Sequence, residues 1–300
     1  MTAPETTVVA PPPMRSGRPR IRETGPLHRD QILTVARTDL KQLIQAKDFW
    51  IPMILLGGIF FVILPTILLG TITTVGDVRV VEQISQAVEV LPEAAKSQID
   101  GDSPQGQASY ALAVFLFAPV AVVIPLTIST AVGAATIVGE RERGTGEFLA
   151  HSPAGVREIY LGKLVASLLP GYVTTIVGFS IYSVIVNTIV GPEVGGWFFP
   201  TTQWWLLMLW VIPPFLALTL SLVLRLSARV KSTAAAQQAS GLVSLPLILI
   251  AYSQSTGALF GGTGVSWFIG ALAWVIAIVS LNRGMKSVSR ARLLGVADEQ

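Results

Sequence analysis

The chain has 300 residues, of which 51% are hydrophobic and only 13% are charged. Soluble domains carry about a quarter charged residues, so this composition excludes an ordinary soluble domain and indicates an integral membrane protein. The net charge of +3 decides little, because the side of the membrane on which charges lie matters more than their sum. The absence of cysteine excludes disulfides and thiolate metal sites, and the two histidines, His28 and His151, lie too far apart in sequence to favour a metal site.

The first 26 residues are proline-rich and basic and contain no apolar core. We expect residues 1–26 to form a disordered cytoplasmic tail, and not a signal peptide, because no apolar stretch follows the positive charges. The basic residues would either determine topology or bind anionic lipid. They are Arg15, Arg18, Arg20 and Arg22.

Residues 27–49 combine helical apolar spacing with many charges. Leu33, Leu40, Leu43 and Ile44 recur on one side of a helix that also carries arginines, lysines and aspartates. This pattern predicts an amphipathic elbow helix lying in the membrane interface before the first span, and a soluble helix packed on a partner is the alternative.

Residues 50–282 are predicted to form an all-α domain of six transmembrane helices. The first predicted span would reach roughly 34 Å at 1.5 Å per residue, enough to cross a bilayer with some tilt. Proline pairs should kink the second and fourth spans, either as bending points or as static kinks. The predicted spans are 50–72, 110–139, 160–190, 204–224, 233–252 and 265–281.

The charges assign the connections to sides of the membrane. The loop of residues 73–109 is acidic and contains a short amphipathic helix, whereas residues 283–300 form a basic tail. With six spans, 19 of the 21 lysines and arginines fall on one side and two on the other. The positive-inside rule therefore places both termini in the cytoplasm.

The most charged stretch, residues 140–163, separates the second and third spans. Its eight charges lie between two apolar runs, so we expect all of them in water or at the membrane surface. Gly144 and Gly146 should end the second helix, and Ser152 with Pro153 predicts the N-cap and first turn of the next one. Such a segment is either a solvated loop that fixes topology or an element that a partner binds. The charged residues are Glu140, Arg141, Glu142, Arg143, Glu147, Arg157, Glu158 and Lys163.

This stretch resembles a known signature. The run E-R-E-R-G-T-G-E from Glu140 to Glu147, then Phe148-Leu149, Ser152-Pro153 and Gly162-Lys163, is similar to the segment after the second membrane helix of type-2 ABC exporter permeases, in their sodium-exporter and multidrug-like branch. The family pattern is roughly E-x-E-x-G-T-x-E-x-L, then S-P, then G-K, and the chain matches each of its positions.

The resemblance implies a half-transporter in the cell membrane. Two permease subunits, identical or similar, would assemble with two cytoplasmic ABC ATPase subunits, which would bind the ATP and magnesium, and no nucleic-acid partner is expected. The elbow helix would lie along the inner leaflet, and the charged stretch would include a short cytoplasmic coupling helix that the ATPase grips. The residues to which the resemblance gives this coupling role are Glu140, Glu142, Arg143, Gly144, Thr145, Glu147, Phe148, Leu149, Ser152, Pro153 and Lys163.

Some chemistry is missing from the sequence. No G-x-x-x-x-G-K-[ST] loop is present to bind phosphates, because Gly162-Lys163 is followed by Leu164. No ionisable side chain falls well inside a predicted span, which argues against a proton-coupled carrier and against a membrane enzyme. We therefore expect no catalytic residues and no cofactor in this chain. A carrier or channel that uses only hydroxyl and amide groups, or a non-transporting scaffold, remains the alternative to an exporter permease.

The third predicted span contains polar but uncharged side chains. They would either line a substrate path or form hydrogen bonds between helices. These residues are Thr174, Thr175, Ser180, Tyr182, Ser183 and Asn187.

Overall fold

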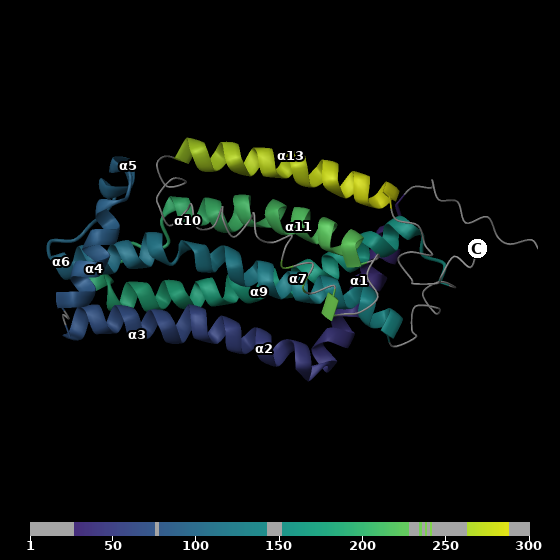
Figure 1. Cartoon of the computed structure of the whole chain (residues 1–300), viewed down its shortest axis with the longest axis horizontal. Coiled ribbons are helices and arrows are strands. Elements are labelled where there is room, and N and C mark those ends of the chain that lie inside the picture. Colours follow the sequence, from purple (N-terminus) through teal and green to yellow (C-terminus); the bar gives the residue numbers. More distant parts are fainter. Residues whose placement is uncertain are drawn as a thin grey trace, which may run out of the picture.

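The computed structural model describes residues 27–75, 78–142, 152–227 and 263–287, together with four isolated residues between 234 and 241. Within these residues every regular element is a helix, and no strand occurs. Figure 1 shows the long helices running side by side along the length of the molecule, with α4, α5 and α6 gathered at one end and α1 at the other. The predicted all-α architecture is confirmed.

The first long rod follows a short helix that lies at an angle to it. α1 ends where Ala46 adopts an extended backbone, with φ −89° and ψ 98°, and the rod begins at the next residue. The predicted elbow segment, residues 27–49, is therefore divided at Ala46, and the first membrane helix starts at Lys47. The elements are α1 (Arg29–Gln45), α2 (Lys47–Gly58), η1 (Ile59–Ile63), α3 (Leu64–Gly70) and η2 (Thr71–Val75).

The acidic loop and the remaining rods follow. The loop contains the short amphipathic helix that was predicted, α4, which buries Ile84 on one side. The elements are α4 (Val78–Glu89), α5 (Glu93–Lys96), α6 (Pro104–Ala111), η3 (Leu112–Leu116), α7 (Ala118–Glu142), α9 (Val156–Ile189), η4 (Gly191–Glu193), α10 (Thr202–Leu206), η5 (Leu207–Val211), α11 (Ile212–Ser227) and α13 (Thr263–Ser287).

Five continuous helices of the described residues are long and apolar enough to cross a bilayer. They overlap the predicted spans, except for the predicted fifth span, residues 233–252, most of which lies outside the described residues. The count of six spans thus stays a prediction. The five helices are Lys47–Thr74, Pro104–Thr136, Val156–Ile189, Thr202–Ser227 and Gly264–Lys286.

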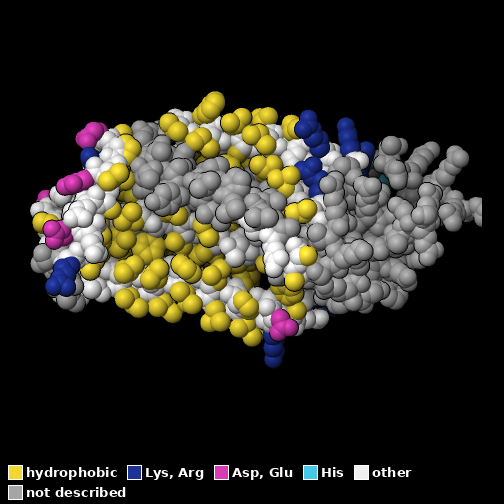
Figure 2. All heavy atoms as spheres, in the orientation of Figure 1, with side chains coloured by type: hydrophobic (Ala, Val, Ile, Leu, Met, Phe, Trp, Pro, Cys, Tyr) yellow, Lys and Arg dark blue, Asp and Glu magenta, His cyan; other side chains and the backbone are white. Residues whose placement is uncertain are grey.

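Apolar side chains cover the sides of this bundle. Figure 2 shows hydrophobic side chains over its middle, acidic side chains gathered at the end that holds α4 and α5, and basic side chains toward the opposite end. Large apolar side chains exposed along α2, α9 and α13 include Ile54 at 57%, Val177 at 54% and Phe268 at 70%. An apolar belt with polar ends matches the cross-section of a bilayer, so the chain is a multi-pass membrane protein.

Prolines explain three of the four π-helical segments. Pro65, Pro119 and Pro213 each follow a π segment by two or three residues, and the carbonyls four and five positions before each proline lie inside that segment. Proline clashes with the carbonyl four residues earlier and has no N–H, so a wider turn relieves the clash. At Pro119 and Pro213 the predicted distortion of the second and fourth spans therefore takes the form of a π turn, whereas Pro125 lies inside α7 without a π segment.

For Pro119 and Pro213, side chains of neighbouring helices satisfy a carbonyl that the proline leaves without a donor. Five residues before Pro119, the carbonyl of Val114 accepts a hydrogen bond from the indole of Trp204 at 2.9 Å. Five residues before Pro213, the carbonyl of Met208 accepts one from the hydroxyl of Tyr172, also at 2.9 Å. Such compensation is required where no water is present.

α9 lies at the centre of the bundle and contacts α1, α2, α3, α7, α11 and α13. Two of its glycines allow especially close approaches. A Cβ on Gly162 would lie 2.7 Å from Val35 of α1, and one on Gly178 would overlap the ring of Phe61 in η1. Small residues at helix crossings are the usual solution in membranes, where close packing provides much of the association energy.

Candidate functional site

The coupling segment predicted from the sequence joins the end of α7 to the start of α9. Glu140 and Glu142 lie in the last turn of α7, and Ser152 and Pro153 form a bend before α9. The other predicted coupling residues of this loop, Arg143, Gly144, Thr145, Glu147, Phe148 and Leu149, fall outside the described residues, and so does the predicted coupling helix. The described part of the site is therefore the base on which this loop stands.

The start of α9 differs from the prediction. The helix begins at Val156 with Gly155 as its N-cap, so the prediction that Ser152 is the N-cap and Pro153 the first helical residue is wrong. Ala154 is buried in a cluster with Ile159, and this contact holds the preceding backbone in a bend.

Glu158 occupies the third helical position of α9 and is buried, with 7% of its surface exposed. Its carboxylate folds back over Gly155, and it accepts a hydrogen bond from the backbone N–H of His28 at 3.4 Å. The imidazole Nδ1 of His28 lies 3.7 Å from the same oxygen. A carboxylate in the first turn is stabilised by the helix dipole, so Glu158 is favoured at the start of α9 and also contacts His28, the residue that precedes α1.

Lys163 lies one helical turn further along α9 and is completely buried. Its ammonium nitrogen lies 3.4 Å from Oδ2 of Asp39 in α1 and donates a hydrogen bond of 2.8 Å to the carbonyl of Thr136 in α7. Asp39 is itself only 6% exposed. One ammonium thus connects α1, α7 and α9.

The environment predicted from the sequence is therefore wrong for two of the eight charged residues between positions 140 and 163. The expectation that all of them lie in water or at the membrane surface is wrong for Glu158 and Lys163. Both are buried because α1 folds back onto α9 and supplies their partners, His28 and Asp39. Hydropathy alone did not show this pairing, since the partners lie 130 and 124 residues apart.

A second polar network links α9 to the later helices near the same end. The hydroxyl of Tyr160 donates to Oγ of Ser221 in α11 at 2.9 Å. The Oγ of Ser221 in turn lies 3.0 Å from Oγ of Ser280 in α13. Arg225 donates to Ser280 Oγ at 2.8 Å and to the carbonyl of Ser221 at 3.0 Å. Nothing in the sequence marks Ser221 and Ser280 as members of a network, because isolated serines in apolar runs carry no recognisable pattern.

The polar residues predicted for α9 fall into two groups. Thr175, Tyr182, Ser183 and Asn187 are buried, Thr174 is half-buried beside Gly57, and Ser180 is exposed with its hydroxyl bonded to its own helix. The first group makes hydrogen bonds within the described chain. Tyr182 donates to the carbonyl of Ala113 at 2.7 Å, which ties α9 to η3.

Asn187 holds the turn that follows α9. Its amide nitrogen donates to the carbonyls of Ser183 and Phe199, and its oxygen accepts from the N–H groups of Phe198 and Phe199 at 2.9 and 3.0 Å. Ser183 Oγ also donates to the carbonyl of Phe199. Phe199 then packs against Trp204, with ring centroids 5.0 Å apart.

The described residues contain no group of three or more metal-ligating side chains. What they provide is a three-helix base, made of α1, the end of α7 and the start of α9, that carries residues 143–151. This base contains three buried charged residues, Asp39, Glu158 and Lys163, each with a partner.

Comparison with known proteins identifies the chain at the family level. A search among curated proteins gave no match. The family model for ABC-2 family transporter protein matches residues 33–264, which is more than half of the 300-residue chain and includes α1, α7, the intervening loop and α9. On this match the chain belongs to the ABC-2 family of transporters, as a membrane permease component.

Proposed function

We propose that this chain is the permease subunit of an ATP-driven exporter. Two copies, or one copy and a similar chain, would assemble with two cytoplasmic ABC ATPase subunits in the cell membrane, with both permease termini in the cytoplasm. The observation that carries the proposal is the family match over a chain whose sequence has the coupling signature but no phosphate-binding loop of its own. ATP and magnesium are thus assigned to the partner subunit.

The loop of residues 143–151 is the proposed contact with the ATPase. Phe148 and Leu149 would insert into a groove of that subunit, and Glu147 would lie at the rim, since a small apolar anchor with charged surroundings is a usual interface design. Glu140, Glu142 and Arg143 would hold the end of α7 against this element.

The base would determine how the helices move when the ATPase displaces the loop. Because Lys163 connects α9 to Asp39 of α1 and to Thr136 of α7, these three helices would tilt together when the loop is displaced. Closure of the ATPases would thereby change the exposure of a path between two permeases by rigid-body rotation.

The polar residues of α9 contribute to this model at two depths. Ser180 is exposed on the surface of α9 and Thr174 is half-buried, so we propose that these two side chains face a path shared with a second subunit. We propose that the buried group, Thr175, Tyr182, Ser183 and Asn187, contributes to the path by fixing the shape of α9 and its outer turn.

The test is co-purification of the tagged protein with its ATPase from native membranes in mild detergent. Replacing Glu147 and Phe148 together with alanine should abolish recovery of a stoichiometric ATPase and the associated ATP hydrolysis. The matched control replaces an exposed acid and an exposed apolar residue at the opposite end, Glu82 and Val90, and should keep both. Recovery of the wild-type protein alone, without any ATPase, would favour a carrier or a scaffold.

A further inference from the structure

A groove lies in the angle between α1 and α2, away from the buried charges of the base. Its volume is about 320 Å³, within the range of small-molecule sites. Apart from Asp48 and Thr127, every lining side chain is apolar or aromatic. The lining residues are Leu40, Leu43, Ile44, Asp48, Phe49, Trp50, Pro52, Met53, Leu56, Thr127, Ile128, Ala131, Val132 and Pro170.

The groove lies at the point where the chain enters the membrane helix. α2 starts the first span at Lys47, so Asp48 and Trp50 are in its first turn. Tryptophan at a helix end is typical of the membrane–water interface. The groove therefore opens at headgroup depth, and Met53 and Leu56 extend it one to two turns toward the hydrocarbon.

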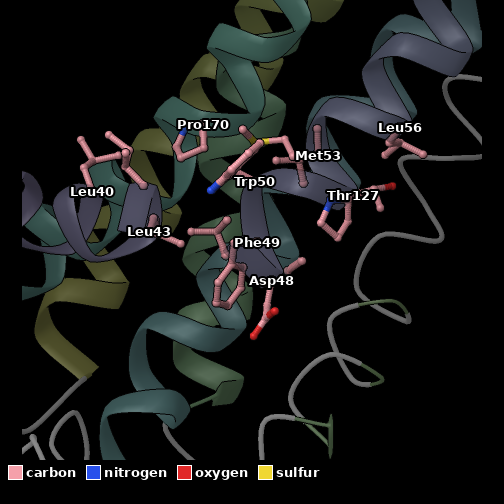
Figure 3. A pocket seen from close by; sticks show the side chains of 14 residues that line it. Leu40, Leu43, Asp48, Phe49, Trp50, Met53, Leu56, Thr127 and Pro170 are labelled. Carbon is pink, nitrogen blue, oxygen red and sulfur yellow. The ribbon is translucent and has the colours of Figure 1, made fainter. Parts of the chain in front are cut away.

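Its two kinds of side chain are separated in space. Figure 3 shows the carboxylate of Asp48 at one edge of the groove, next to Phe49, while Met53, Pro170 and Leu56 lie further in. Within the part of the chain that the structure describes, Asp48 has no ion pair, and it is exposed, as is its neighbour Lys47. An apolar slot with a carboxylate at its edge complements a molecule with a hydrocarbon tail and a positively charged group in its head.

We propose that this groove binds a phospholipid whose headgroup carries an ammonium ion. One acyl chain lies against Met53, Leu56 and Pro170, and the lipid ammonium pairs with Asp48. Charge complementarity selects this occupant, because the only charged residue lining the groove is an acid, which repels an anionic headgroup and attracts an ammonium. The lipid acts as a wedge that sets the angle between α1 and α2.

The test is photo-crosslinking of the purified full-length chain in nanodiscs. The probes are phosphatidylethanolamine and phosphatidylglycerol that carry the same diazirine-labelled acyl chain, and the readout is the amount of each lipid attached to peptides containing Met53, Leu56 or Thr127. Wild-type protein should show about fivefold more labelling by phosphatidylethanolamine, as expected for one interfacial charge pair. No ATPase, cargo or transport is needed, so the result is independent of the proposed function.

Variants make the assignment specific. Asp48→Asn should lower phosphatidylethanolamine labelling to the phosphatidylglycerol level, and Asp48→Lys should reverse the preference. Asp30→Asn is the matched control, because Asp30 is an exposed acid in the first turn of α1 that does not line the groove. Ala131→Trp, which fills the groove, should reduce labelling by both lipids.

Three results would overturn the proposal. Equal labelling by the two lipids in the wild type would mean that the headgroup is not recognised. An unchanged preference in Asp48→Asn would mean that this carboxylate does not select the ammonium. Labelling by neither lipid would mean that a protein segment, from this chain or a second copy, covers the groove.

Discussion

Lys163 is completely buried, so its ammonium group is removed from water. The charge is stabilised by the carboxylate of Asp39 and the carbonyl of Thr136. Removing one partner of a buried ion pair is far more costly than replacing both, since the remaining charge is left without compensation. The pair thus stabilises one arrangement of α1, α7 and α9 more by excluding others than by its net energy.

We predict that Lys163→Met destabilises the protein by about 3–5 kcal/mol, because Asp39 is left charged and buried. The double variant Lys163→Met with Asp39→Leu should recover much of this loss. The stability of both variants can be measured by thermal unfolding in detergent, with loss of the monodisperse protein as the signal. Effects that simply add would show that the two side chains are not energetically coupled.

For single residues, the sequence shows which ones belong to the family signature, but it does not show which of them are buried. Gly162-Lys163 was recognised as part of a signature, but nothing in its spacing indicated that Lys163 is buried. The sequence marks Asn187 only as one of several polar residues, whereas in the structure it fixes the turn before α10 through three hydrogen bonds to Phe198 and Phe199. Burial of a polar side chain depends on a partner brought from elsewhere in the chain, and periodicity carries no record of that partner.

Among the elements, the packing of α1 on α9 has the most direct consequence for the base. Gly162 permits this contact, since the Cβ of any other residue would lie 2.7 Å from Val35 and 3.0 Å from the carbonyl of Ile32. Real Cβ atoms do not approach this closely, so a larger residue must displace α1.

We predict that Gly162→Ala lowers stability by about 1–3 kcal/mol through this overpacking. A second change, Val35→Ala, should restore only a small part of the loss, because it removes Cγ1 of Val35 but keeps the Cβ, which also lies 2.7 Å from the added atom. Gly58→Ala is the matched control: it lies in the same bundle with no atom within 4 Å of its added Cβ, so it should be neutral or stabilising by up to about 1 kcal/mol. The melting temperatures of the four proteins decide the matter, and equal losses at Gly162 and Gly58 would contradict the packing argument.

The helices themselves were largely predictable, because long apolar runs and prolines are local signals. The positions at which the first span and α9 begin, Lys47 and Val156, were not predictable. They depend on contacts that α1 and Ala154 make with residues remote in sequence. The π segments also escaped prediction: proline indicates a distortion, but only the aromatic donors Trp204 and Tyr172 show how its carbonyls are satisfied.

For the whole molecule, the separation of charge predicts an orientation. Acidic side chains gather at the end formed by α4 and α5 and basic ones toward the other (Figure 2). Since the chain has no cysteine, single cysteines can report on each end without a background.

We predict that Ser97→Cys, beyond α5, reacts with a membrane-impermeant maleimide in intact cells, because the acidic end lies outside. Thr38→Cys, on α1, should react only after the membrane is permeabilised. Both positions are exposed in the structure, so poor access through burial is not a concern. The reverse labelling pattern would invert the proposed topology and would contradict a cytoplasmic ATPase bound to the loop between α7 and α9.

The π segments have a consequence for how such a bundle can move. Each π turn holds one residue more than an α turn, and one residue corresponds to a rotation of about 100° around the helix axis. Expelling the extra residue from η5 would therefore rotate α11 relative to α10 by a little more than a quarter of a turn, which would change the side chains that α11 presents to its neighbours. The helix would stay continuous during this rotation. The hydrogen bond from Tyr172 to the carbonyl of Met208 would stabilise the π-helical form seen here.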